Sequence, residues 1–185
     1  MKKILIITIS HQAKDVRLYY KLGKTLSEKY SVTILHNNPD MGDHDEEITL
    51  TGLNNLSKVQ FLLQAAIQIK LSSPAVVIIV EPILLTLVNP TLKTKFVYDC
   101  HEFFNLAQKE KSVDKRKQFI DTYLHERLEK RFIPKLNACI TVNDIITHKY
   151  QSMGANSITI PNYPYSRYEE ERSSDEKIYD FIYAG

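Results

Sequence analysis

An apolar run near the middle of the chain ends abruptly in residues that can do chemistry. Lys95–Tyr98 is followed directly by Asp99, Cys100, His101 and Glu102. In an open parallel sheet, ligands bind in the crevice outside the carboxyl ends of the strands. An imidazole at such a strand end titrates near neutral pH and suits proton transfer. The pattern therefore predicts a ligand site at this strand end, with His101 as its catalytic residue.

Each of these side chains also has a purely structural interpretation. His101 would then only hydrogen-bond a neighbouring loop. Glu102 could orient His101 or accept a hydrogen bond from a substrate hydroxyl, or it could simply cap the next turn, and Asp99 is expected to be structural. Cys100 and Cys139 match no zinc spacing and form no disulfide framework, so we expect buried thiols and no metal site.

Further candidates follow other strand-like runs. His11 lies in the loop after the first run, Asp15 and Arg17 start the next helix, and Asn143 and Asn162 follow two later strands. We predict that all five, together with Glu102, bind substrate. The alternatives are that the helix dipole alone favours Asp15, that Asn143 is a helix cap and that Asn162 is a turn residue.

The loop after the first strand contains no glycine. A dinucleotide-binding loop needs glycines so that backbone amides can approach a pyrophosphate at a helix N-terminus. Here the loop is Ser10–Asp15, and the first glycine, Gly23, lies well inside the helix. We therefore expect no NAD or FAD and no phosphate contact at this loop. A Walker loop is also absent from the sequence, so no cofactor is predicted.

These candidates must be positioned by strands that alternate with helices. Strand-type runs are expected at 2–9, 31–35, 48–50, 75–80, 95–99, 138–142 and 157–160, and helices at 15–30, 56–71, 82–88, 114–133 and 144–153. Such alternation predicts an α/β, Rossmann-like fold with a mostly parallel sheet and helices on both faces. Right-handed crossovers then bring all strand carboxyl ends to one rim. The rim residues are Ser10–Gln12, His36, Glu81, Asp99–Glu102, Asn143-Asp144 and Pro161-Asn162.

The 185 residues suffice for one domain and a short extension. We expect a domain at 1–162, a linker at 163–177 that is rich in Pro, Ser, Tyr and acidic residues, and the first strand of a second domain at 178–185. The apolar content of 43% supports a core, and the net charge of +2 gives no general attraction to nucleic acid. With no signal peptide and no apolar run long enough to span a membrane, a cytoplasmic location is expected.

The order of elements and three local patterns resemble the N-terminal domain of GT-B glycosyltransferases, specifically the large retaining group called family 4. The first pattern is Asp15-x-Arg17 at a helix start, followed by the strand Ser31–Ile34. The second is Val97–Glu102, close to the family's valine-tyrosine-aspartate-x-histidine-glutamate strand end. The third is spread over the last third of the chain: Glu129, Asn137–Asn143, Gly154 and Ile158–Asn162. The resemblance covers essentially the whole chain.

The resemblance implies transfer of a sugar from a nucleotide-sugar donor to a glycan or lipid-linked acceptor, as in cell-surface polysaccharide synthesis. It implies retention of anomeric configuration, no required metal, an acceptor-side N-terminal domain and a donor-binding C-terminal domain. His101 would contact the transferred sugar or help to deprotonate the acceptor. The family often has glycines after the first strand, and it usually has Ser where this chain has Asn143. The chain alone is expected to be inactive.

Two alternatives stay open from the sequence. The chain could be half of a GT-B-type nucleotide-sugar epimerase, or a stand-alone α/β binding module. A separate hypothesis concerns the basic stretch Lys109–Lys135, whose charged side is either simply solvated or attracts anionic lipid head groups at the inner face of the membrane. The second possibility would make the protein peripheral to the membrane.

Overall fold

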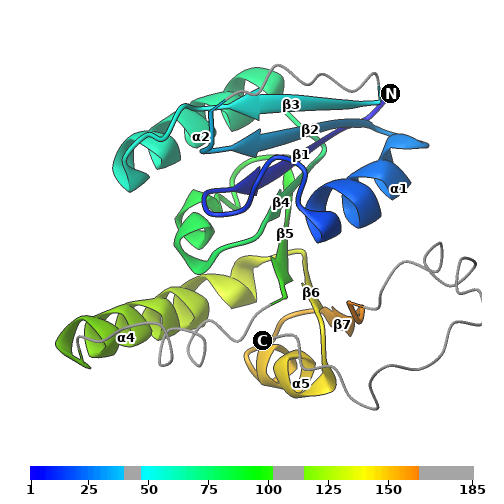
Figure 1. The fold of residues 1–185 in the computed structure, drawn as a ribbon. Coiled ribbons are helices and arrows are strands. Elements are labelled where there is room, and N and C mark those ends of the chain that lie inside the picture. Colours follow the sequence, from blue (N-terminus) through cyan, green and yellow to red (C-terminus); the bar gives the residue numbers. More distant parts are fainter. Residues whose placement is uncertain (40–46, 102–114, 163–185) are drawn as a thin grey trace, which may run out of the picture.

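A single parallel sheet of seven strands forms the centre of the molecule (Figure 1). The computed structural model describes residues 1–39, 47–101 and 115–162. The strand order is β3-β2-β1-β4-β5-β6-β7, and every neighbouring pair is parallel. The strands are β1 Lys3–Thr8, β2 Ser31–His36, β3 Ile48–Gly52, β4 Val76–Ile79, β5 Lys95–Cys100, β6 Ala138–Thr141 and β7 Ser157–Thr159. The predicted α/β, Rossmann-like class is confirmed.

Helical segments follow most of the strands, as predicted. They are η1 Val16–Gly23, α1 Lys24–Ser27, α2 Lys58–Ser72, η2 Pro82–Leu87, α4 Lys115–Phe132, η3 Ile133–Lys135 and α5 Asp144–Ser152. Ser57 and Gln60 form a capping box at the start of α2, because each side chain satisfies a backbone amide of the other.

The first helix differs from the single helix predicted for residues 15–30. It begins as the π-helix η1 and becomes α-helical only at Lys24. The change occurs at Gly23, where an added Cβ would lie 3.0 Å from the Leu18 carbonyl oxygen and 3.0 Å from Ile48 Cδ1. The missing side chain lets the helix backbone approach the sheet closely. Periodicity alone does not signal this wider turn.

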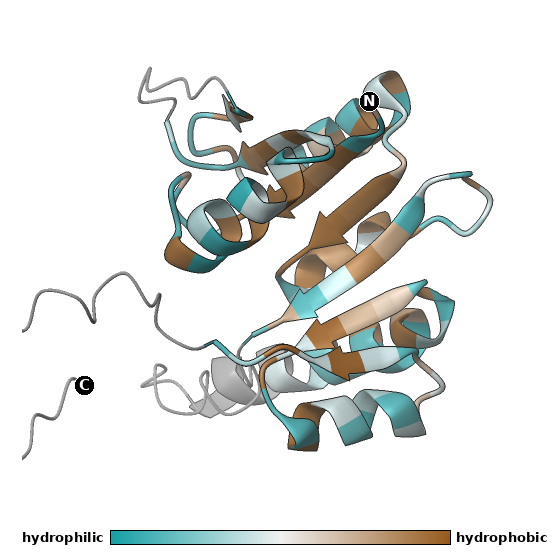
Figure 2. Ribbon diagram, turned by 90° about the vertical axis from the view of Figure 1, so that its right-hand side faces the viewer, coloured by the Kyte–Doolittle hydropathy of each residue, from teal (hydrophilic) through white to brown (hydrophobic). Residues whose placement is uncertain are grey.

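The core has two layers because successive strand residues point to opposite faces of the sheet. On one face, Leu5 and Ile7 of β1 pack in the cluster that includes Phe61 of α2. On the other, Ile4 and Ile6 pack with Leu18 and Tyr19 of η1. Figure 2 shows the strands as mainly apolar and the surrounding helices as mixed. Helices therefore cover both faces, as predicted.

Several predictions fall outside the described residues. The linker at 163–177, the strand at 178–185 and Glu102 are among them. Within the described ranges, no helix is long and apolar enough to cross a bilayer.

Candidate functional site

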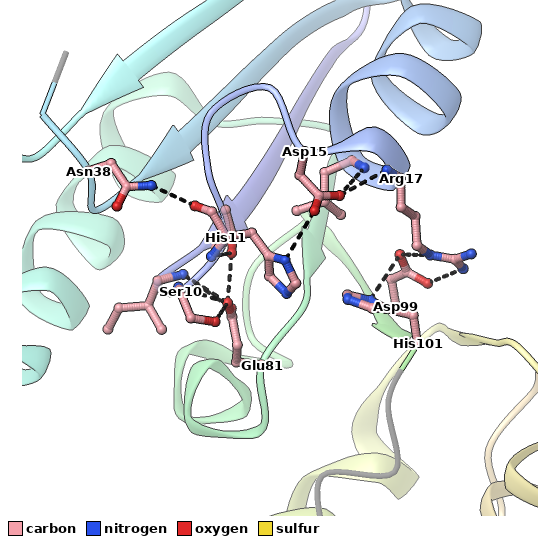
Figure 3. Close-up of polar contacts among 11 residues, drawn as sticks. Ser10, His11, Asp15, Arg17, Asn38, Glu81, Asp99 and His101 are labelled. Carbon is pink, nitrogen blue, oxygen red and sulfur yellow. Dashed lines mark hydrogen bonds and ion pairs between the residues drawn. The ribbon is translucent and has the colours of Figure 1, made fainter. Parts of the chain in front are cut away.

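The carboxyl ends of β1, β4 and β5 meet at the centre of the sheet. The strand order of the sheet reverses between β1 and β4: β2 and β3 lie on one side of β1, and β4–β7 lie on the other. Ligands of open α/β sheets bind at such a switch point. Figure 3 shows that this edge brings together the loop after β1, Glu81 after β4, and Asp99 and His101 at the end of β5.

Glu81 organises the loop after β1. Its buried carboxylate accepts hydrogen bonds from the hydroxyls of Thr8 at 2.6 Å and Ser10 at 2.7 Å. It also accepts from the amides of Ser10 at 3.0 Å and Ile9 at 3.2 Å, and the Thr8 hydroxyl accepts from the His11 amide at 3.1 Å. These amides point at protein oxygens instead of a ligand's phosphate. The absence of phosphate contact at this glycine-free loop stays a prediction.

Replacement of Glu81 by Gln should destabilise the protein by about 1–3 kcal/mol. A neutral amide weakens the charge-assisted bonds and turns an NH₂ group toward donors, which leaves buried N–H groups without an acceptor. Urea unfolding measures this loss. Thr8→Val, which removes one donor to the same carboxylate and the acceptor of the His11 amide, should cost less than Glu81→Gln, which disturbs four donors. Equal stability of Glu81→Gln and the wild type would show that the carboxylate does not hold the loop.

Arg17 and Asp99 form a buried ion pair between η1 and β5. The guanidinium Nε lies 2.9 Å from Asp99 Oδ2 and a terminal nitrogen lies 2.6 Å from Oδ1, a bidentate arrangement. Arg17 is 8% exposed and Asp99 is 1% exposed. The Arg17 side chain turns inward to neutralise Asp99, and its assignment to substrate binding stays a prediction. Asp99 therefore joins Arg17 of η1 to the strand end that carries His101.

His101 follows Asp99 at the end of β5 and faces His11. Its Nδ1 lies 3.9 Å from Asp99 Oδ2, close enough for electrostatic stabilisation of an imidazolium but longer than a hydrogen bond. The centroids of the two imidazole rings are 4.8 Å apart, with the rings tilted by 57°. The structure thus brings together two predicted site residues that are distant in sequence.

His11 is held on its other side by Asp15. The two side chains are 3.3 Å apart, Nδ1 to Oδ2, and the Asn38 amide donates to the His11 carbonyl oxygen at 2.8 Å. Asp15 also caps η1, since its Oδ1 accepts from the amides of Arg17 and Leu18. The hydrogen bond from His11, helped by these amides, lowers the pKa of Asp15 to about 2. Asp15 therefore both starts the helix and positions His11.

Replacement of Asp15 by Asn should remove a pH-dependent part of the stability. Because the pKa of Asp15 falls from 3.8 to about 2 on folding, its charge stabilises the native state above pH 4, and this contribution disappears as the pH falls toward 2. Solvent screening reduces the contribution to about 1 kcal/mol. Asn keeps the helix cap. Urea unfolding should give a wild-type advantage at pH 6 that shrinks by pH 2.5. An unchanged difference would contradict the His11–Asp15 interaction.

Asn143 and Asn162 have local partners. Asn143 caps α5, since its side-chain oxygen accepts from the Ile146 amide at 3.0 Å. Asn162 is exposed and accepts a hydrogen bond from Lys21 Nζ of η1 at 2.7 Å. Neither of these two hydrogen bonds involves His11 or His101. Their assignment to substrate binding stays a prediction.

A buried polar cluster lies beneath this edge. Glu129 of α4 accepts from Tyr150 Oη at 2.8 Å and from Lys149 Nζ at 2.5 Å, and Tyr150 Oη lies 3.2 Å from Cys100 Sγ. Burial raises the pKa of the Cys100 thiol to about 11 and that of Cys139 to about 12. Both thiols are buried, as predicted, and their raised pKa values favour the protonated form. Among the described residues, no group of His, Cys, Asp and Glu could hold a metal ion.

Comparison with known proteins identifies the fold but not a family. No family model and no curated protein matches the sequence. The structure is similar to sucrose-phosphate synthase from Thermosynechococcus elongatus, with a TM-score of 0.64 and 11% sequence identity. The match covers 87% of this chain and 48% of that one, so the chain spans about half the length of this neighbour.

Proposed function

We propose that this chain is the acceptor-side domain of a retaining GT-B glycosyltransferase. The observation that carries the proposal is the His11–His101 pair at the switch point of the sheet, where each imidazole lies near a carboxylate. The fold shared with sucrose-phosphate synthase supports it. A sugar would pass from a nucleotide-sugar donor to a glycan or lipid-linked acceptor in polysaccharide synthesis in the cytoplasm.

In this proposal, His101 accepts the proton of the acceptor hydroxyl. Asp99, 3.9 Å from Nδ1, stabilises the imidazolium that forms, and Arg17 holds this carboxylate in place. His11 packs against the ring and restricts its orientation. These residues would position and deprotonate the acceptor. The other requirement of sugar transfer, binding of the donor, is not met by them.

The donor would be bound mainly by a second domain. The amides of the loop after β1 are already hydrogen-bonded to Glu81 and Thr8, which leaves them unable to bind a donor pyrophosphate. The neighbouring structure is about twice as long as the segment that matches, consistent with a two-domain enzyme. Residues 1–185 alone are therefore proposed to be inactive.

The test uses the full-length protein with a panel of nucleotide-sugars and glycan or lipid-linked acceptors. Mass spectrometry should detect a glycosylated acceptor, and NMR of its anomeric proton should show retention. Turnover without an acceptor, giving an epimerised nucleotide-sugar, would replace the proposal by an epimerase. Binding of a ligand with no turnover would favour a binding module.

A further inference from the structure

The amino edge of the sheet, opposite the candidate site, carries exposed lysines. The strands β1, β4 and β5 begin there side by side, since the Ala75 amide donates to the Lys3 carbonyl and the Lys95 amide to the Ala75 carbonyl. The segments entering these strands, 1–3, 70–75 and 91–95, contain no acidic residue. We call their exposed lysines the basic edge: Lys2, Lys3, Lys70, Lys93 and Lys95.

The charge of the basic edge is largely uncompensated by its surroundings. No ion pair found within the described ranges includes any of its five lysines. The nearest acidic residues in strand order, Glu28 and Glu47, precede β2 and β3, and Glu47 pairs with Lys24 at 2.9 Å. Clustered charges of one sign create a field that attracts an anionic partner and is screened by salt.

Exposed apolar side chains adjoin these charges. α2 packs on the sheet through Phe61, Ala65 and Ile69, and leaves a stripe of aliphatic residues at spacings of four exposed to solvent. This apolar stripe consists of Val59, Leu63, Ile67 and Leu71. It ends at the basic edge, where Leu71 is 75% exposed beside Lys70 and Leu92 is 40% exposed beside Lys93.

The position of Leu92 is fixed close to the end of α2. Thr94 Oγ1 donates to the Pro74 carbonyl oxygen at 2.8 Å, which joins the loop containing Leu92 to the turn after α2. α2 itself contains lysines at both ends and no acidic residue. Aliphatic and cationic side chains therefore lie close together where α2 ends, the combination found on proteins that lie on anionic membranes.

We propose that the basic edge and the apolar stripe dock on an anionic lipid bilayer. Lysines attract the head groups, while Leu71 and Leu92 enter the boundary of the acyl chains. A second copy of the chain fits less well, because a symmetric interface would bring the basic edge against itself. Single-stranded nucleic acid also fits less well, because the three segments offer no aromatic side chain for base stacking. The proposal does not depend on sugar transfer.

Flotation with vesicles tests the proposal. The purified chain should bind vesicles of phosphatidylcholine with 30 mol% phosphatidylglycerol, bind pure phosphatidylcholine at least about tenfold more weakly, and be released by 0.5 M salt. The Leu71→Gln/Leu92→Gln and Lys70→Glu/Lys93→Glu variants should each lose about tenfold or more in partition coefficient.

The matched control lies at the opposite edge of the sheet. Ile145→Gln replaces an aliphatic residue that is 72% exposed at the start of α5. This variant should bind vesicles within about twofold of wild type, and circular dichroism should show native melting for every variant because all of these residues are exposed.

Three results would overturn the proposal. The first is no binding of the wild type to anionic vesicles. The second is equal loss of binding in the control and test variants. The third is that the surface binds another partner. The chain would then bind a single-stranded oligonucleotide more tightly than vesicles, or it would form a dimer in solution that the Leu71→Gln substitution dissociates.

Discussion

Replacement of His101 by Ala in the full-length enzyme should lower turnover by about two orders of magnitude or more. The imidazole is the proposed acceptor of the substrate proton, and general base catalysis contributes about 10²–10⁴-fold. Its ring contacts His11 and lies 3.9 Å from Asp99. Steady-state kinetics with the identified donor and acceptor measures the loss, which should appear in kcat more than in KM.

Two controls separate catalysis from packing. His148→Ala removes an exposed histidine of α5 and should leave turnover and melting temperature unchanged. His101→Gln retains hydrogen-bonding capacity at this position but cannot take up a proton, so it should be nearly as inactive as His101→Ala. The melting temperature of both His101 variants should change little. Retained activity with a large fall in melting temperature would show that His101 is structural.

Replacement of Arg17 by Met should destabilise the protein by about 3–5 kcal/mol, because it leaves the buried Asp99 carboxylate without its partner. This loss is a large fraction of the about 5–15 kcal/mol that stabilises an ordinary domain. The double variant Arg17→Met/Asp99→Asn should be more stable than Arg17→Met alone, because no buried charge is left unpaired. A double-mutant cycle from urea unfolding gives the coupling.

An exposed ion pair serves as the matched control. Lys24 and Glu47 are 2.9 Å apart, with side chains that are 33% and 60% exposed. Their coupling in the same type of cycle should be only about 0–1 kcal/mol and should decrease with salt. A coupling for Arg17 and Asp99 as small as this would contradict the role of the buried pair.

The sheet could be predicted from the sequence because its strands are short, continuous apolar runs. β1 and β4 are buried on both faces, and this pattern differs clearly from that of the helices between them. Their carboxyl ends then identify the rim, so Glu81 and His101 could be assigned to one edge. The π-helix η1 could not be predicted, because the close approach of the backbone at Gly23 to Ile48, which leaves no room for a Cβ, arises only in three dimensions.

The contacts within the rim could not be predicted, because their partners lie far apart in the chain. Arg17 and Asp99 are separated by 82 positions and Ser10 and Glu81 by 71. The sequence places Ser10, Glu81 and Asp99 at one edge of the sheet but does not say which side chains meet. Glu81 received no role for this reason, although an acidic residue directly after the most apolar strand was a usable signal. Nothing in the sequence near Arg17 indicates that its charge neutralises the buried Asp99.

The carboxylate of Glu81 has a consequence for how the free protein receives its substrate. Loops that wrap around a phosphate are often ordered only when the ligand arrives, and binding then carries the entropic cost of that ordering. Here the carboxylate of Glu81, together with the Thr8 hydroxyl, already holds the backbone from Thr8 to His11 in place. The amide protons of Ile9, Ser10 and His11 should therefore exchange slowly with solvent before any ligand is bound. Substrate recruitment at this edge should proceed as rigid-body docking on a preformed surface, with His11 already in place.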